Sequence, residues 1–135
     1  MKVVKMEKLK YGTLEWWQEF QKRWNSDPEG MKTLKGFGKG VYVVTDRPDL
    51  KPIMAHWDEE GKLTEVRYAE PDENPYVTVS ASYDIWKAVY TGELSATKAL
   101  MQRKYKVDGP LSAGLKYKKG VDKCNKIGGE MPTEW

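Results

Sequence analysis

The stretch TGELSATKALMQRKYKVDG, residues 91–109, decides how this chain folds. It contains the end of one helix, a second short helix for which Ser95 is a suitable N-cap, and then a basic strand. In that strand Tyr105 and Val107 alternate with lysines, which predicts a half-buried strand over residues 104–108. The Asp-Gly-Pro that follows is a turn signal. Helices that lead directly into a half-buried strand indicate a domain in which helices cover a sheet.

Upstream of this stretch, residues 40–81 read as four strands. Three of them follow one another as a meander, with a hairpin turn at residues 58–62 and Ile53, Ala55 and Trp57 on one face of the second. A loop with two prolines precedes the fourth strand, in which Val77 and Val79 share a face. Two helices are then expected over residues 82–102, the first capped by Ser82.

The N-terminal part of the chain predicts a helix over residues 13–25 with Thr13 as its N-cap. Trp17, Phe20 and Trp24 fall on one stripe of this helix, and Trp16 widens it. Asp27 and Pro28 then open a short second helix.

At the other end, Leu111, Leu115 and Val121 indicate a C-terminal helix, although Gly114 and Gly120 interrupt the pattern. Because the strands alternate, only one sheet face is strongly apolar. We therefore expect a single α+β domain over residues 1–135, with a two-layer arrangement of helices on that face.

Composition sets limits on function. The chain has 135 residues, of which 32% are charged and 39% apolar, and no apolar run is long enough for a transmembrane helix. Residues 1–10 lack the apolar core of a secretory signal. With one cysteine there is no internal disulfide. We expect a cytoplasmic protein.

Charge is distributed unevenly along the sequence. Residues 11–97 carry 10 basic and 15 acidic side chains, whereas residues 98–126 carry nine basic side chains against Asp108 and Asp122. Such a basic segment suits nucleic acid, acidic head groups or a phosphorylated ligand, and equally a solvated lysine surface.

Catalytic candidates are isolated. His56 is the single histidine, and alternation places it on the face opposite Ile53 and Trp57. Cys124 lies among lysines that favour its thiolate, but no histidine is predicted beside it. One histidine and one distant cysteine do not make a metal site. The GFGKG segment at residues 36–40 is followed by a strand and not by a helix, so it does not match a dinucleotide-binding loop. We expect no enzyme activity, cofactor or metal.

A longer segment resembles a known family. Residues 77–117, VTVSASYDIWKAVYTGELSATKALMQRKYKVDGPLSAGLKY, are similar to the C-terminal half of the sterol carrier protein type-2-like domain. The shared elements, in order, are VTVS, SYDIWKAVY, TGEL, ATKALM, KYKVDG and LSAGLKY. One departure is Arg103, where the family often has Gly, so we expect a helix end without left-handed geometry there.

The resemblance implies a five-stranded, mostly antiparallel sheet with helices on one face and an apolar tunnel between the layers. In this sequence it implies a set of apolar candidates for ligand contact: Trp17, Phe20, Trp24, Val77, Val79, Trp86, Val89, Tyr90, Leu94, Leu100, Met101, Tyr105 and Val107. Candidates for contact with a head group or phosphate are Arg103, Lys104, Lys106, Lys116 and Lys118.

The resemblance implies binding or transport of an apolar lipid, such as a fatty acid, a fatty acyl-CoA or a sterol-like molecule. Transient contact with an anionic membrane surface fits the basic segment. An alternative is a non-catalytic module that presents an acyl substrate to a partner enzyme, which the sequence does not identify. A nucleic-acid-binding protein is a further alternative for the basic segment, but we expect no nucleic acid as a partner.

Overall fold

The computed structural model describes residues 7–110 and 112–135 of the chain. A five-stranded sheet has the order β4-β3-β2-β5-β6. Its strands are β2 (Gly38–Val44), β3 (Ile53–Trp57), β4 (Leu63–Tyr68), β5 (Val77–Ala81) and β6 (Lys106–Asp108). The β2–β5 pair is parallel and the other neighbours are antiparallel. The predicted five-stranded, mostly antiparallel sheet is confirmed.

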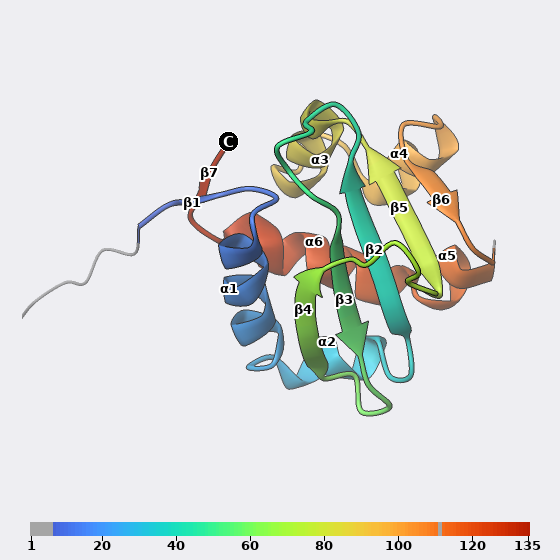
Figure 1. Cartoon of the computed structure of the whole chain (residues 1–135). Helices are drawn as coiled ribbons and strands as arrows, with labels where there is room; N and C mark the ends of the chain where they lie inside the picture. The colour runs from blue at the N-terminus through green and yellow to red at the C-terminus, as the bar shows by residue number, and fades with distance from the viewer. Residues whose placement is uncertain (1–6, 111) are drawn as a thin grey trace, which may run out of the picture.

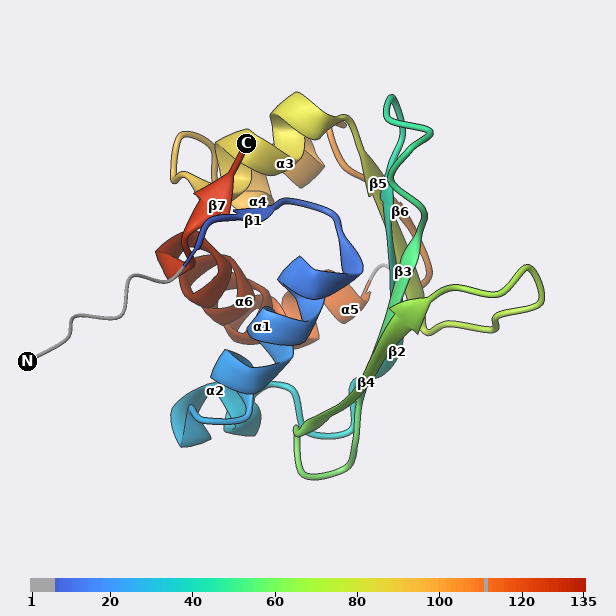
Figure 2. The same cartoon turned by 60° about the vertical axis from the view of Figure 1, so that its left-hand side comes forward.

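The six helices of the described residues lie on one face of this sheet, as Figure 2 shows from the side. They are α1 (Leu14–Trp24), α2 (Pro28–Thr33), α3 (Tyr83–Tyr90), α4 (Ala96–Met101), α5 (Ser112–Lys116) and α6 (Lys118–Glu130). The helix α6 runs behind the sheet and contacts α1, α2 and α3. The two-layer α+β prediction is therefore confirmed.

Short polar side chains begin the first four helices, as predicted. The hydroxyl groups of Thr13, Ser82 and Ser95 accept hydrogen bonds from backbone N–H groups three residues later, at donor–acceptor distances of 3.3, 3.4 and 3.1 Å. The Asp27 carboxylate does the same for the N–H of Gly30. Each cap satisfies a donor that the helix itself leaves unpaired.

The aromatic stripe of α1 forms the centre of the core. Trp16, Trp17, Phe20 and Trp24 are all buried. Trp16 and Phe20 stack with an interplanar angle of 8°, and Trp24 donates a 2.8 Å hydrogen bond from Nε1 to the Gly61 carbonyl. Burial of whole indole rings is compatible with a stable core because most of their polar N–H groups find acceptors.

The expectation for Arg103 is wrong. Its φ of 58° lies in the left-handed region. The N–H groups of Arg103 and Lys104 donate to the carbonyls of Leu100 and Ala99 at 3.1 and 2.8 Å, which is the Schellman pattern of helix ends. These two hydrogen bonds offset the strain that a side chain causes in this conformation, so the junction keeps its geometry without glycine.

The C-terminal helix prediction needs correction in two ways. The region forms two helices, α5 and α6, and Leu115 is 85% exposed and does not anchor either of them. Leu111 lies outside the described residues. Gly120 does not break α6: a Cβ there would lie 2.2 Å from Leu34 Cδ2, so glycine allows α6 to approach α2 closely.

A two-stranded parallel sheet joins the ends of the described chain and was not predicted. It pairs β1 (Leu9–Lys10) with β7 (Thr133–Glu134). Trp16 Nε1 donates a 3.0 Å hydrogen bond to Thr133 Oγ1, and Trp135 stacks on Tyr11 at a centroid distance of 4.9 Å. Strands of two residues carry no alternation, so the sequence pattern gives no signal for them.

The sheet face away from the helices carries polar residues and two buried apolar ones. Glu73, from the loop between β4 and β5, accepts hydrogen bonds from Arg67 at 2.8 Å and Lys39 at 3.1 Å. Met54 and Val41, which pair in register, are buried on this side. Burial of Met54 was not predicted, because alternation assigned only Ile53, Ala55 and Trp57 to a core.

Candidate functional site

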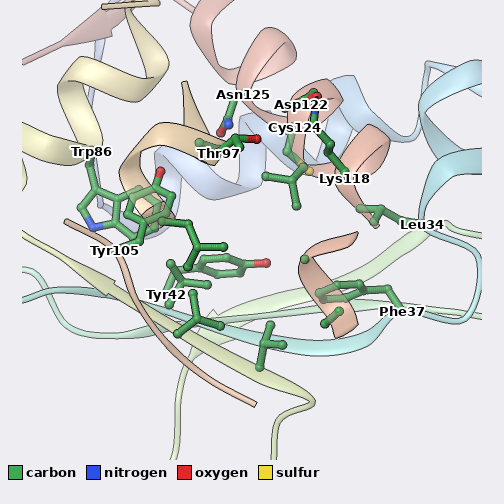
Figure 3. A pocket seen from close by; sticks show the side chains of 18 of the residues that line it. Leu34, Phe37, Tyr42, Trp86, Thr97, Tyr105, Lys118, Asp122, Cys124 and Asn125 are labelled. Atoms are coloured by element: carbon green, nitrogen blue, oxygen red, sulfur yellow. Dashed lines mark hydrogen bonds and ion pairs between the residues drawn. The ribbon is translucent and has the colours of Figure 1, made fainter. Parts of the chain in front are cut away.

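A cavity of about 150 Å³ lies between the sheet and the helices. Its wall on the sheet side comes from β2, β3, β5 and β6, and its opposite wall comes from α1, α3, α4, α5 and α6. Figure 3 shows it from close by, with Tyr42 on the sheet side and Cys124 and Asn125 on the α6 side. The site is therefore enclosed by elements far apart in the sequence.

The sheet register builds the floor of the cavity. Tyr42 of β2 pairs with Val79 of β5, and Val79 pairs with Val107 of β6. All three side chains line the cavity because residues paired in register point to the same face. Val77, two residues before Val79, extends the floor along β5.

The helices supply a mixed wall. Trp17 and Phe20 of α1 and Trp86 and Tyr90 of α3 make one side aromatic. The α6 side comes from Val121, Cys124 and Asn125, at positions i, i+3 and i+4 of one helical face, together with Lys118 and Asp122.

Polar groups gather at one end, where α4 meets α6. Lys118 Nζ lies 2.8 Å from Asp122 Oδ2, and both side chains are about half exposed. Thr97 of α4 and Asn125 lie beside them in the lining. Among the described lining residues, one lysine is thus paired with one carboxylate, and this part of the wall carries no net charge.

Burial keeps the remaining ionisable groups of the wall neutral. It raises the pKa of the Tyr42 and Tyr90 hydroxyls well above their usual value. Burial also raises the pKa of the Tyr105 hydroxyl and of the Cys124 thiol. Loss of solvation penalises the charged form in each case. The neighbouring lysines therefore do not make Cys124 a reactive thiolate.

Most of the predicted apolar candidates lie in this lining. Nine of the 13 are there: Trp17, Phe20, Val77, Val79, Trp86, Tyr90, Leu100, Tyr105 and Val107. The other four lie outside it. Trp24 and Val89 are buried in the core, Leu94 packs against it, and Met101 is 78% exposed on α4.

The basic candidates separate in the same way. Lys118 contributes to the lining and pairs with Asp122. The other four, Arg103, Lys104, Lys106 and Lys116, are exposed and lie outside the cavity wall.

Several lining residues were missed from the sequence. Tyr42 lies in a segment recognised as a strand, and its alternation with Val41 and Val43 was the available signal. Val121, Cys124 and Asn125 have helical spacing, but the glycines of α6 obscured it. Phe37 and Leu34 come from the connection after α2, which has no periodicity to read.

No cluster of three or more metal-ligating side chains occurs among residues 7–110 and 112–135. His56 lies on the sheet face opposite the cavity, as predicted, since Ile53, Ala55 and Trp57 face the helices. In the described part of the chain, no helix is both long and apolar enough to span a bilayer.

Comparison with known proteins gives a consistent result. The model of the SCP-2 sterol transfer family matches residues 18–122. Curated protein sequences show no significant match to this chain.

Solved structures share the fold at low sequence identity. A crystal structure of sterol carrier protein 2 has a TM-score of 0.76 and 19% identity, covering 90% of this chain and 99% of that one. A conserved hypothetical protein from Thermus thermophilus, described as possibly a sterol carrier protein, has a TM-score of 0.74 and 18% identity, covering 98% and 97%. A UbiJ-SCP2 ubiquinone synthesis protein has a TM-score of 0.58 and 13% identity, covering 79% and 85%.

Proposed function

The chain belongs to the SCP-2 sterol transfer family, and we propose that it binds an apolar lipid in the cavity between sheet and helices. Membership supports lipid binding or transfer as the general class of function. The observation that carries the specific proposal is the cavity itself, with its floor of Tyr42, Val79 and Val107 and its aromatic wall. Each methylene of a ligand that leaves water there contributes about 0.8 kcal/mol.

The lining selects an uncharged ligand segment. Lys118 and Asp122 neutralise each other in an ion pair, and the buried tyrosines and Cys124 stay neutral. Within the described residues, the Thr97 hydroxyl and the Asn125 amide make no side-chain hydrogen bond. They are available to a polar group at the end of the ligand. A fatty acid, a fatty acyl-CoA or a sterol-like molecule satisfies this description when its charged part remains outside.

Cavity size sets a condition on binding. Pockets for drug-sized ligands have volumes of about 300–1,000 Å³, whereas this cavity has about 150 Å³. A long chain must therefore push side chains aside or extend through the opening. Leu100 is 44% exposed and also lines the cavity, so its movement opens the site with little loss of packing.

The test is a titration of delipidated protein with fatty acids, fatty acyl-CoA and a sterol, followed by tryptophan fluorescence. Trp17, Trp57 and Trp86 line the cavity, so ligand entry is expected to change the emission. The variant Val79→Phe fills the floor and is expected to abolish the response. Val43→Phe is its matched control, because Val43 lies next to Tyr42 on β2 and faces the other side of the sheet. A flat titration with every ligand class contradicts the proposal.

A second candidate is an accessory module that presents the lipid to a partner enzyme. The likeness to the UbiJ-SCP2 ubiquinone synthesis protein favours it. This role predicts that a lipid-modifying enzyme co-purifies with the chain and loses activity when the chain is removed. A carrier acting alone predicts lipid exchange between vesicles with purified protein and no second component.

A further inference from the structure

A hydroxyl group without a hydrogen-bond partner lies on the floor of the cavity. Tyr42 belongs to β2, the middle strand of the sheet, and its side chain lines the cavity. Among residues 7–110 and 112–135, no donor or acceptor forms a hydrogen bond with Tyr42 Oη. Figure 3 shows this hydroxyl pointing into the space between the sheet and the α6 wall that carries Cys124. The fold therefore leaves a polar group free inside an otherwise apolar part of the site.

The oxygen of this hydroxyl has room beside it for a ligand atom. In the described part of the chain, Trp57 Nε1 is the one side-chain nitrogen or oxygen of a buried or partly buried residue that is both fully enclosed and unpaired. Tyr42 Oη is also unpaired, so it must border open space, and the space beside it is the cavity. Burial raises the pKa of this hydroxyl, so it stays neutral and can both donate and accept a hydrogen bond.

Neighbouring rings and a glycine hold the Tyr42 hydroxyl in one position. The Tyr42 ring stacks on Trp17 at a centroid distance of 5.1 Å, and the indoles of Trp57 and Trp86 meet it edge to face at 6.4 Å each. Gly40, two residues earlier, lies on the same face of β2. A Cβ on Gly40 would lie 2.6 Å from Tyr42 Oη. Gly40 has no positive φ, so the space that the hydroxyl needs explains the glycine better than backbone geometry does.

We propose that Tyr42 selects lipids that carry an uncharged oxygen function, a hydroxyl or a carbonyl, in the interior of the apolar chain. This inference rests on the proposed lipid-binding function and names the ligand class of the same site. A plain hydrocarbon segment beside Tyr42 displaces water and leaves the hydroxyl unpaired, which opposes binding. A ligand oxygen at that place pairs with the hydroxyl instead. Sites that hydrogen-bond a ligand oxygen discriminate against the analogue that lacks it.

The position of Tyr42 separates this contact from the charged end of the cavity. Lys118 and Asp122, which are about half exposed, mark the side where the cavity meets solvent. Tyr42 lies on the middle strand, and the groups that act on its pKa besides burial are Cys124 and Tyr105, which are both neutral. A charged ligand end therefore stays near the ion pair, and the second oxygen of the ligand lies further inside.

The test compares the affinities of two fatty acids for the delipidated full chain by tryptophan fluorescence. The ligands are stearic acid and a hydroxystearic acid whose hydroxyl lies near the middle of the chain. The unmodified protein is expected to bind the hydroxylated acid about ten-fold more tightly, because stearic acid leaves Tyr42 Oη unpaired. A hydroxystearic acid with its hydroxyl next to the carboxylate is expected to bind as stearic acid does, because that oxygen does not reach Tyr42.

Two variants remove the contact in different ways. Tyr42→Phe keeps the ring and is expected to lose the preference while binding stearic acid at least as tightly as the unmodified protein. A merely structural defect would instead weaken both acids equally. Gly40→Ala keeps the hydroxyl but forces it out of its place, and it is expected to lose the preference as well. The matched control is Tyr76→Phe, since Tyr76 is partly buried outside the cavity lining, and it is expected to keep the preference.

Failure of this selectivity and failure of lipid binding are distinguishable. Equal affinity of the unmodified protein for the two acids overturns the inference about Tyr42 and leaves lipid binding in place. The inference is also overturned if Tyr42→Phe or Gly40→Ala keeps the full preference, or if Tyr105→Phe removes the preference and Tyr42→Phe does not. If no lipid of either kind binds, both proposals are overturned together.

Discussion

Replacing Gly120 with alanine tests how closely α6 packs against α2. Alanine has a helix propensity about 1 kcal/mol better than glycine, so a solvent-exposed glycine would gain stability from this change. At Gly120 the new Cβ would lie 2.2 Å from Leu34 Cδ2, 2.6 Å from Leu34 Cγ and 3.0 Å from the Thr33 carbonyl oxygen. Leu34 is buried and cannot move freely. Overpacking of this kind costs about 1–3 kcal/mol, and we expect a net destabilisation of about 1 kcal/mol.

The assay is thermal unfolding followed by circular dichroism, with Gly114→Ala as the matched control. Gly114 lies in α5, and its new Cβ would find Leu100 Cδ2 at an ordinary 3.7 Å. That variant is expected to be as stable as the original or more so. A chain of this size loses roughly 3–5 °C in melting temperature per kcal/mol. If Gly120→Ala melts at or above the temperature of Gly114→Ala, the close approach of the two helices is refuted.

Three further perturbations have defined outcomes. Arg103→Gly is expected to raise the free energy of unfolding, measured in urea, by about 1 kcal/mol because it relieves left-handed strain. Arg103→Ala retains the strain and is expected to leave that free energy unchanged. Equal free energies of unfolding for the two variants would contradict strain at this position. Hydrogen bonds from Arg67 lower the pKa of Glu73 from 4.5 to about 2, so the stabilisation is present above pH 4.5 and is lost as pH falls toward 2. In Glu73→Gln, the melting temperature is expected to fall less steeply between pH 4.5 and pH 2 than in the unmodified protein. An unchanged pH dependence would contradict the stabilising hydrogen bonds between Arg67 and Glu73. Since burial raises the pKa of the Cys124 thiol, a thiol reagent at pH 8 should react slowly before unfolding and fast after it; immediate reaction would show an accessible thiol.

Local chemistry made much of the fold predictable. Thr13, Asp27, Ser82 and Ser95 mark helix starts because their side chains accept a backbone hydrogen bond three residues on, a signal that needs no knowledge of the rest of the chain. The strands were recognisable because β-branched and aromatic residues alternate with polar ones. The half of the site that lies on these elements, such as Val79 and Trp86, followed from the same patterns.

The remaining features depend on contacts between distant segments. Gly120 reads as a helix breaker in sequence, and only its approach to Leu34 shows that it is a packing residue. Arg103 adopts a left-handed conformation because two backbone hydrogen bonds hold it there. Cys124 has lysines as its sequence neighbours, whereas α6 turns it toward the apolar cavity. Alternation and helical periodicity carry no information of this kind.

Lipid binding in the cavity is tested most directly by native mass spectrometry of the freshly purified protein. Extraction into organic solvent then releases whatever is bound. We expect a bound mass in the lipid range that is released into the solvent and is missing from Val79→Phe but present in Val43→Phe. A bare chain mass for the unmodified protein that stays bare after incubation with each class of lipid would contradict lipid binding in this cavity.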